Sequence, residues 1–185
     1  MNVSPDSALL TAARRLDRDA LAAIYDQMSP GIYRYAMRLL GDETRAEECV
    51  AETFNRFLQA LHNGGGPNDH VQAYLYRIAH NWITDSYRRQ VPDLPIEEDY
   101  PAGQDVPSQA DRQIEQKQVR NALACLTPEQ RQAVVLKYLE GWENEAVARA
   151  MQKPVGAVKA LQHRGVEALR RLLTPMEAIK HDVQE

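Results

Sequence analysis

Apolar residues recur at intervals of three and four along most of this chain, the spacing that places them on one face of an α-helix. In the first half the pattern predicts four helices, over residues 18–28, 29–40, 42–61 and 71–89. Asp17 and Asp42 can each cap the helix that follows, and Gly41 is a typical helix stop. Pro30 suits a first helical position, and it is the reason to begin a separate helix near residue 29.

The second half predicts four further helices, over residues 109–126, 131–139, 144–151 and 155–173. Thr127, followed by Pro128 and then by Gln130, combines an N-cap, a proline at the first helical position and a capping-box glutamine. Asn144 is the expected cap of the short helix, and residues 152–154 form the turn after it. No segment shows the strict alternation of a strand, so we expect an all-α fold.

Residues 91–111 separate the two groups of helices. They contain four prolines and six acidic residues, no Lys or Arg, and no periodic apolar pattern. We therefore predict two small helical domains, over residues 1–90 and 112–175, joined by an acidic, proline-rich linker and followed by a short tail over 176–185.

The formal net charge of −4 is unevenly distributed along the chain. Residues 1–90 carry −1, the linker carries −6, and residues 112–185 carry +3. The C-terminal part is thus mildly basic within an acidic protein. Because the local field at a contact face decides whether nucleic acid binds, the overall acidity does not exclude DNA binding.

The two cysteines, Cys49 and Cys125, lie far apart, each on an apolar helical stripe. We expect both to be small buried hydrophobes, and neither a disulfide framework nor a zinc site. No apolar run is long enough to span a bilayer, and the N-terminus lacks the pattern of a signal peptide. The sequence therefore predicts a cytoplasmic protein without membrane insertion.

Catalytic motifs are absent from the sequence. It contains no P-loop, no GxSxG, no HExxH and no paired carboxylates, and its five histidines do not cluster with Cys or Asp at ligand spacing. We therefore predict that the protein is not an enzyme and that it holds no metal and no cofactor.

A short helix, a three-residue turn and a longer basic helix follow one another in the last third of the chain, which is the layout of a helix-turn-helix DNA reader. In such a unit the N-terminal half of the second helix contacts base edges, while flanking cations contact phosphates. The alternative is a solvated amphipathic helix with ordinary surface cations. The candidate DNA-binding residues are Lys153, Lys159, Ala160, His163 and Arg164.

Residues 73–89 interleave aromatic rings with cations and an amide, a combination suited to unpaired DNA, because bases stack on rings while cations follow the phosphates. The alternative is that some of the rings pack the core, which spacing cannot exclude for any one of them. The candidates in this segment are Tyr74, Tyr76, Arg77, Asn81, Trp82, Arg88 and Arg89.

These segments, in this order and separated by an acidic linker, resemble bacterial sigma factors of the extracytoplasmic-function group of the sigma-70 family. Residues 45–61 (RAEECVAETFNRFLQAL) resemble the helix that docks on core RNA polymerase, residues 73–89 the helix that reads and melts the minus-ten element, and residues 126–164 the region that reads the minus-thirty-five element. The likeness extends from about residue 17 to residue 173.

The resemblance implies a promoter-specificity factor whose partners are core RNA polymerase, promoter DNA and, in many members, an anti-sigma protein. It implies that the loop over 64–70, which includes Asn68, captures a base flipped out of the duplex. It further implies that the docking helix contacts polymerase through exposed polar residues, here Glu47, Glu48, Glu52, Asn55 and Arg56.

Two other functions fit parts of the sequence. A stand-alone regulator that binds duplex DNA through the helix-turn-helix would not need the aromatic and basic segment, so replacing Tyr76 and Trp82 with Ala should leave its DNA affinity intact. A helical protein-interaction module without a DNA function should lose no polyanion binding when Lys159 and Arg164 become Ala, and should depend little on salt.

Overall fold

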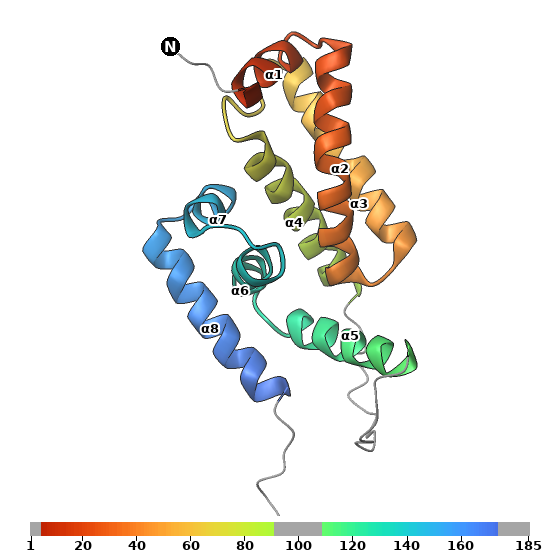
Figure 1. Cartoon of the computed structure of the whole chain (residues 1–185), viewed down its shortest axis with the longest axis vertical. Helices are drawn as coiled ribbons and strands as arrows, with labels where there is room; N and C mark the ends of the chain where they lie inside the picture. The colour runs from red at the N-terminus through yellow and green to blue at the C-terminus, as the bar shows by residue number, and fades with distance from the viewer. Residues whose placement is uncertain (1–4, 91–108, 174–185) are drawn as a thin grey trace, which may run out of the picture.

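Helices make up nearly all of the described part of the chain, which in this computed structural model comprises residues 5–90 and 109–173, with side chains described over 8–88 and 116–173 (Figure 1). No strand occurs within these ranges, in agreement with the predicted all-α class. The elements are α1 (Pro5–Ala13), α2 (Arg18–Leu40), α3 (Glu43–His62), α4 (Val71–Gln90), α5 (Gln109–Ala124), α6 (Pro128–Val134), the π-helix η1 (Val135–Leu139), α7 (Asn144–Met151) and α8 (Val155–Leu173).

Helix α2 corrects the prediction of two helices that meet near residue 29. It runs without a break from Arg18 to Leu40, with Pro30 inside it. The proline removes one backbone donor. However, the buried stripe formed by Ile24, Ile32 and Tyr35 continues on both sides of it. Burial of this stripe against α3 and α4 outweighs one missing hydrogen bond, so the two predicted helices are one.

The N-terminal bundle consists of α1 to α4, and its core lies where α2, α3 and α4 meet. The predicted caps are present, because the side chains of Asp17 and Asp42 accept hydrogen bonds from the backbone N–H groups of Ala20 and Arg45. Gly41 ends α2 with a left-handed φ of 66°. The pattern did not predict α1, whose Leu10 and Ala13 are buried in the core.

The C-terminal bundle consists of α5 to α8. Its predicted capping box is present at the start of α6, where Thr127 and Gln130 exchange hydrogen bonds of 3.2 and 3.3 Å. The segment predicted as one helix to Leu139 changes to a π-helix at Val135. Asn144 is not the cap of α7, as predicted, but its first residue, and Glu143 precedes it as the N-cap.

The prediction that both cysteines are buried is correct for Cys49 and wrong for Cys125, which is exposed. Cys125 lies just after the last residue of α5, where the chain turns toward α6. Helical spacing predicts which side of a residue faces the core only while the helix continues. Because α5 ends at Ala124, the spacing gave a wrong prediction of burial for Cys125.

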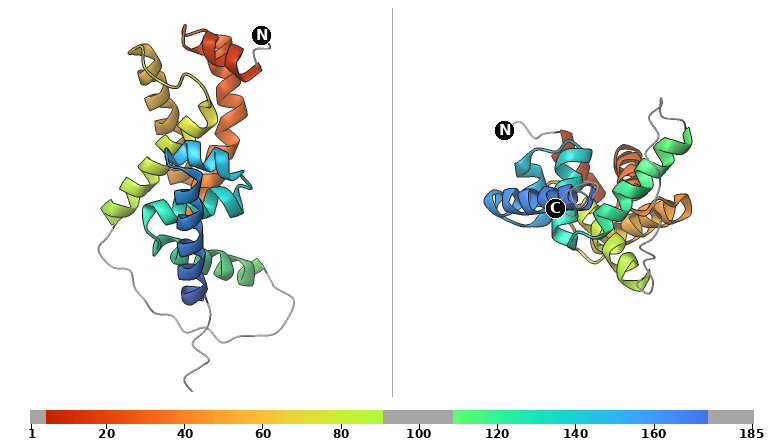
Figure 2. Two further views of the ribbon diagram at one scale, coloured as in Figure 1. Left: turned by 90° about the vertical axis from the view of Figure 1, so that its left-hand side faces the viewer. Right: turned by 90° about the horizontal axis from the view of Figure 1, so that it is seen from below.

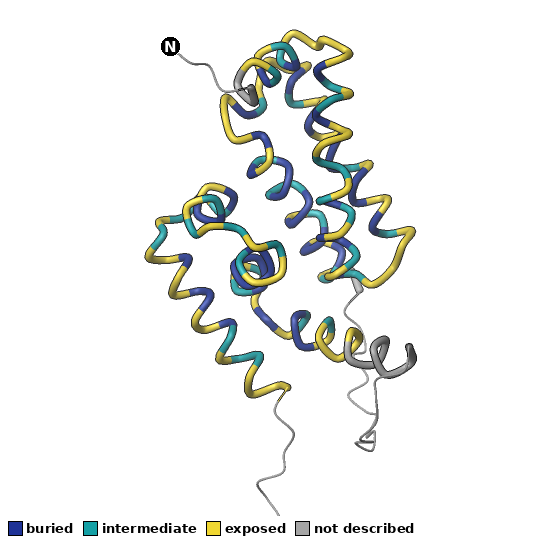
Figure 3. Tube along the Cα trace, in the orientation of Figure 1, coloured by how far each residue is buried: buried dark blue, intermediate teal, exposed yellow. Residues whose placement is uncertain are grey.

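The two bundles pack against each other. Helix α4 lies against α7, and α2 lies against α5 (Figures 1 and 2). Figure 3 shows buried residues gathering along α4 and α6, where the bundles meet. Most of the predicted linker, residues 91–108, and the predicted tail lie outside the described residues. None of the described helices combines the length and hydropathy needed to cross a membrane.

Candidate nucleic-acid interface

Helix α8 presents a cationic face to solvent. It packs on α5, α6 and α7 through Val158, Leu161, Gln162 and Gly165, and it lies on the outer side of the molecule, away from α2 and α3 (Figure 1). The helical period then turns the predicted base-reading positions outward: Lys159, Ala160, His163 and Arg164 are all exposed. Lys153, in the turn before α8, forms an ion pair of 2.9 Å with Glu129.

A partly buried hydrogen bond joins the two helices of this unit. Gln162, in the middle of α8, donates to the side-chain oxygen of Asn144 at the start of α7, over 3.0 Å. Gly165 allows a close approach of α8 to α6, because a Cβ at this position would lie 2.6 Å from a methyl carbon of Val134. The hydrogen bond thus joins α8 to α7, and the close approach at Gly165 joins α8 to α6.

The aromatic and basic segment on α4 divides between core and surface. Tyr76 is 3% exposed and lies against Tyr35 and Trp142, at ring-centroid distances of 5.3 and 4.7 Å. Burial raises the pKa of Tyr76 to about 12. Tyr74 and Trp82 are half-buried against the core, and the guanidinium of Arg77 lies 5.1 Å from the centroid of the Tyr74 ring.

Asn81 and Arg88 on α4 are exposed, and Arg88 lies 3.7 Å from Asp85. Arg89 belongs to the same helix, but its side chain lies outside the described residues. Tyr76 is therefore the one candidate among the described side chains of α4 that is almost wholly inaccessible in this arrangement. Solvent reaches the stripe formed by Arg77, Asn81 and Arg88.

This solvent-accessible stripe forms one wall of a groove of about 580 Å³ between the two bundles, hereafter the interdomain groove. Its opposite wall is the start of α6 and the turn after α7, including Glu129, Gln132 and Lys153. Four cationic side chains line the groove against two acidic ones, Asp85 and Glu129, and this excess of positive charge favours a phosphate backbone.

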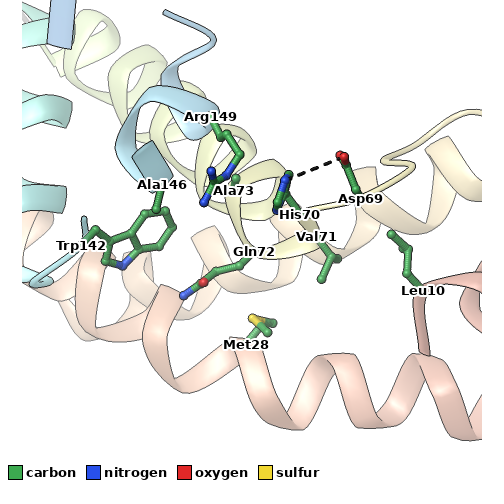
Figure 4. A pocket seen from close by; sticks show the side chains of 10 residues that line it. All are labelled: Leu10, Met28, Asp69, His70, Val71, Gln72, Ala73, Trp142, Ala146 and Arg149. Atoms are coloured by element: carbon green, nitrogen blue, oxygen red, sulfur yellow. Dashed lines mark ion pairs between the residues drawn. The ribbon is translucent and has the colours of Figure 1, made fainter. Parts of the chain in front are cut away.

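A second cavity, of about 290 Å³, lies where the loop before α4 meets α7 (Figure 4). Asp69 and His70 line it from the loop, with the Nε2 atom of His70 lying 3.8 Å from the Oδ2 atom of Asp69. Trp142 and Arg149 line it from the C-terminal bundle. Asn68, the predicted base-capture residue of this loop, is exposed. Arg14 steadies the loop by donating a hydrogen bond of 2.8 Å to the carbonyl of Pro67.

The surface of α3 carries the predicted polymerase-docking residues. Glu47, Glu48, Asn55 and Arg56 are exposed, and Glu52 is half-exposed. Arg56 forms an ion pair of 2.7 Å with Glu52, and hydrogen bonds from Arg56 and Asn55 lower the pKa of that carboxyl group.

A groove of about 510 Å³ between α2 and α3 adjoins the predicted docking residues. Tyr25 and Tyr33 line it together with Glu47 and Val50. Sequence analysis did not single out these tyrosines. An exposed aromatic on an otherwise polar face of α2 was the only available signal, and such residues are common on surfaces.

Two family models match the chain: Sigma-70 region 2 over residues 24–91, and Sigma-70 region 4 over residues 116–169. The chain is 32% identical over 170 residues to the ECF RNA polymerase sigma factor BldN of Streptomyces coelicolor, covering 89% of this chain and 64% of that protein. It is 30% identical over 170 residues to the ECF RNA polymerase sigma factor SigL of Mycobacterium tuberculosis, covering 90% of this chain and 96% of that protein. The chain belongs to the extracytoplasmic-function group of the sigma-70 family.

Solved structures agree on the fold of this sigma factor. The structure of CnrH in complex with the cytosolic domain of CnrY has a TM-score of 0.69 at 23% identity, covering 91% of this chain and 96% of that one. RpoE of Bartonella quintana, solved in complex with the anti-sigma factor NepR, has a TM-score of 0.58 at 20% identity, covering 84% and 97%. The two family models and the curated relatives make this chain a promoter-recognising sigma factor, and the solved structures agree with its fold.

Proposed function

We propose that this sigma factor binds core RNA polymerase through α3 and directs it to promoters through two DNA-reading surfaces. The exposed face formed by Lys159, Ala160, His163 and Arg164 reads the minus-thirty-five element in the major groove, and Lys153 contacts the adjacent phosphates. The observation that carries this proposal is the outward orientation of this cationic face on a helix-turn-helix that the region 4 model matches.

The minus-ten element is read and melted by α4 and by the loop before it. Arg77, Arg88 and Arg89 contact the phosphates, Asn81 contacts a base edge or the backbone, and the flipped base enters near Asn68. The rings of Tyr74 and Trp82 supply stacking surfaces for unpaired bases. Support comes from the excess of cations over acids in the lining of the interdomain groove and from the exposure of Asn81 and Arg88.

Polymerase docking is assigned to the polar face of α3, which consists of Glu47, Glu48, Glu52, Asn55 and Arg56. The tyrosine-lined groove between α2 and α3 extends this surface. The region 1–90 acts as the docking and melting domain and the region 112–175 as the duplex reader, while residues 91–111 connect them.

The factor acts by binding alone, without a catalytic step, and it works in the cytoplasm, where core polymerase is found. The structural neighbours CnrH and RpoE were solved with protein partners, and NepR is described as an anti-sigma factor. An anti-sigma protein is accordingly the expected regulator of this chain.

The decisive experiment is run-off transcription with bacterial core RNA polymerase on a library of genomic fragments, with and without the factor. We expect transcripts that depend on the factor, and their start sites reveal its promoter elements. The double variant K159A/R164A should lose the minus-thirty-five-dependent transcripts, while R171A on the last turn of the same helix should retain them.

Salt dependence of duplex binding gives a second measure of the same surface. The plot of log affinity against log salt concentration has a negative slope, and each phosphate contact removed should make that slope shallower by about one unit. Transcription that does not depend on the factor, together with no co-migration with core polymerase, would contradict the proposal and favour a stand-alone duplex binder.

A further inference from the structure

Helix α1 lies beside the loop that leads into α4 (Figures 1 and 2). Leu10 and Ala13 anchor this helix in the core of the N-terminal bundle, and Leu10 also lines the cavity that Asp69 and His70 of the loop line (Figure 4). The match to Sigma-70 region 2 begins at residue 24, beyond the end of α1. That match therefore assigns no role to α1.

A cation at the end of α1 reaches the loop. Arg14 follows the last residue of the helix, and its backbone N–H still bonds to the carbonyl of Leu10 over 3.0 Å. Its Nη1 donates a hydrogen bond of 2.8 Å to the carbonyl of Pro67, which lies 53 positions further along the chain. Arg14 is half-buried and Pro67 is buried, so water competes less for this bond than it would at an exposed site. The bond ties the loop to α1.

This hydrogen bond acts on the peptide unit that carries Asn68. The carbonyl of Pro67 and the N–H of Asn68 belong to one planar group. A donor held 2.8 Å from the carbonyl oxygen therefore restricts the rotation of that group. Asn68 itself is exposed, and the proposed function places it where the flipped base enters. Arg14 thus restricts the directions in which the Asn68 side chain leaves the loop.

The composition of the loop makes such a restraint valuable. Three consecutive glycines precede Pro67, and two of them adopt left-handed φ angles of 74° and 85°. Glycine loses more conformational freedom on ordering than any other residue, so ordering this run upon DNA binding costs free energy. The N–H groups of Gly64 and Gly65 bond to carbonyls of α3 over 3.0 and 2.8 Å and hold the start of the loop. The Arg14 bond restrains the part that follows.

We propose that Arg14 is a positioning residue for base capture, which holds the peptide between Pro67 and Asn68 in the geometry that receives the flipped base. Arg14 acts through the loop and does not touch the base. This inference rests on the proposed function, which assigns base capture to the loop over 64–70. It extends the minus-ten reader to a helix that precedes the region 2 match.

The consequence is a loss of base selectivity when the bond is removed. A promoter with the preferred base gains from capture by the loop, whereas a promoter with another base at that position does not. Ordering a looser loop costs free energy only where capture occurs. The preferred promoter therefore loses activity, and the others do not.

The test is run-off transcription with core RNA polymerase and the full chain, on a promoter recovered from the library of genomic fragments. The four bases are placed in turn at each position of the minus-ten element, and selectivity is the ratio of transcript from the best base to transcript from the worst. We expect the wild type to give a high ratio at the position of the captured base. In R14M, which keeps the apolar stem and removes the donors, that ratio should fall by about fivefold. The ratios within the minus-thirty-five element should not change.

Two control variants separate positioning from charge and from stability. R15M removes the same charge from the adjacent, exposed Arg15 and should keep the wild-type ratio. R14K retains a cationic donor of similar reach and should recover most of the selectivity that R14M loses. A ratio between bases does not depend on how much of the protein is folded, so a merely structural role would not change it.

A second substitution serves if circular dichroism shows that R14M does not keep the helix content of the wild type. R14Q is polar, and its amide nitrogen lies two bonds short of the Nη1 position, so it should not reach the carbonyl of Pro67. The ratio should fall in R14Q as it does in R14M.

The inference is overturned if a folded R14M or R14Q keeps the wild-type ratio, or if R15M lowers the ratio as much as R14M does. It is also overturned if the ratios within the minus-ten and minus-thirty-five elements fall together, or if the wild type prefers no base within the minus-ten element. These results leave factor-dependent transcription by the wild type intact, so the proposed promoter-directing function survives them. Absence of factor-dependent transcripts with the wild type would overturn that function and this inference with it.

Discussion

Arg131 is a buried cation without an acidic partner among the described residues, and its removal provides a quantitative test of how the C-terminal bundle is held. It is 4% exposed. Its guanidinium donates three hydrogen bonds, of 2.9, 3.2 and 3.0 Å, to the carbonyls of Leu123, Ala124 and Leu126. These are the carbonyls at and just beyond the end of α5, which have no helical donors left to bind them.

The substitution R131M keeps most of the aliphatic stem and removes the donors. Each hydrogen bond from a charged donor contributes about 1.5 to 3 kcal/mol. Desolvation of the guanidinium offsets part of this stabilisation, and it also lowers the pKa of Arg131. One guanidinium nitrogen is buried without a hydrogen-bond partner among the described residues. Including the loss of the contact with Tyr87, about 1 kcal/mol, we expect a net loss of about 3 kcal/mol in the free energy of unfolding.

The assay is urea denaturation of the full chain followed by far-UV circular dichroism. With a slope of about 2 kcal/mol per molar, the midpoint should fall by about 1.5 M. The matched control Y87F keeps the ring over Arg131 and loses only the hydroxyl that donates to the carbonyl of Leu39, so it should cost about 1 kcal/mol. A loss below about 1 kcal/mol in R131M would refute the reasoning, because it would mean that the three carbonyls find other donors at little cost.

Three further predictions follow from single contacts. Burial first, and then the charge of Arg131, lowers the pKa of His80 to about 3. Between about pH 6.5 and pH 3 the unfolded chain therefore binds a proton that the native chain does not, so the free energy of unfolding should be highest above pH 6.5 and fall by about 2 kcal/mol by pH 5. A pH-dependent loss of the same size in H80Q would contradict this assignment to His80. G41A should cost about 1 kcal/mol in thermal unfolding, because φ is 66° at this position and a Cβ would lie 2.4 Å from the Arg120 side chain; an unchanged melting temperature would count against that geometry. Q162L should cost about 1 kcal/mol by leaving the Asn144 oxygen to water, and it should weaken duplex binding more than binding to a single strand; an equal loss of both would show that the hydrogen bond does not position α8.

Local features of the sequence determined most of the helices. The caps at Asp17 and Asp42 and the capping box at Thr127 depend on residues three positions apart, which is why they could be read without a structure. The periodic stripe of α8 likewise determined which of its residues face solvent, because burying Val158 and Leu161 turns Lys159 and Arg164 outward. The family resemblance rested on these same segments.

Tertiary contacts decided the rest. Pro30 reads as a helix start because a sequence shows the missing donor but not the continuous core stripe that keeps α2 in one piece. Arg131 and Glu140 look like ordinary surface charges, and only the packing of distant helices buries them beside Tyr87 and Arg38.

Tyr76 illustrates the same division. Its position among cations on α4 determined that it could stack on a base, but residue 142, sixty-six positions away, determines that it is covered. The spacing of side chains along a helix is a local property, whereas the choice between a ring that meets DNA and a ring that meets another domain depends on where the second domain docks.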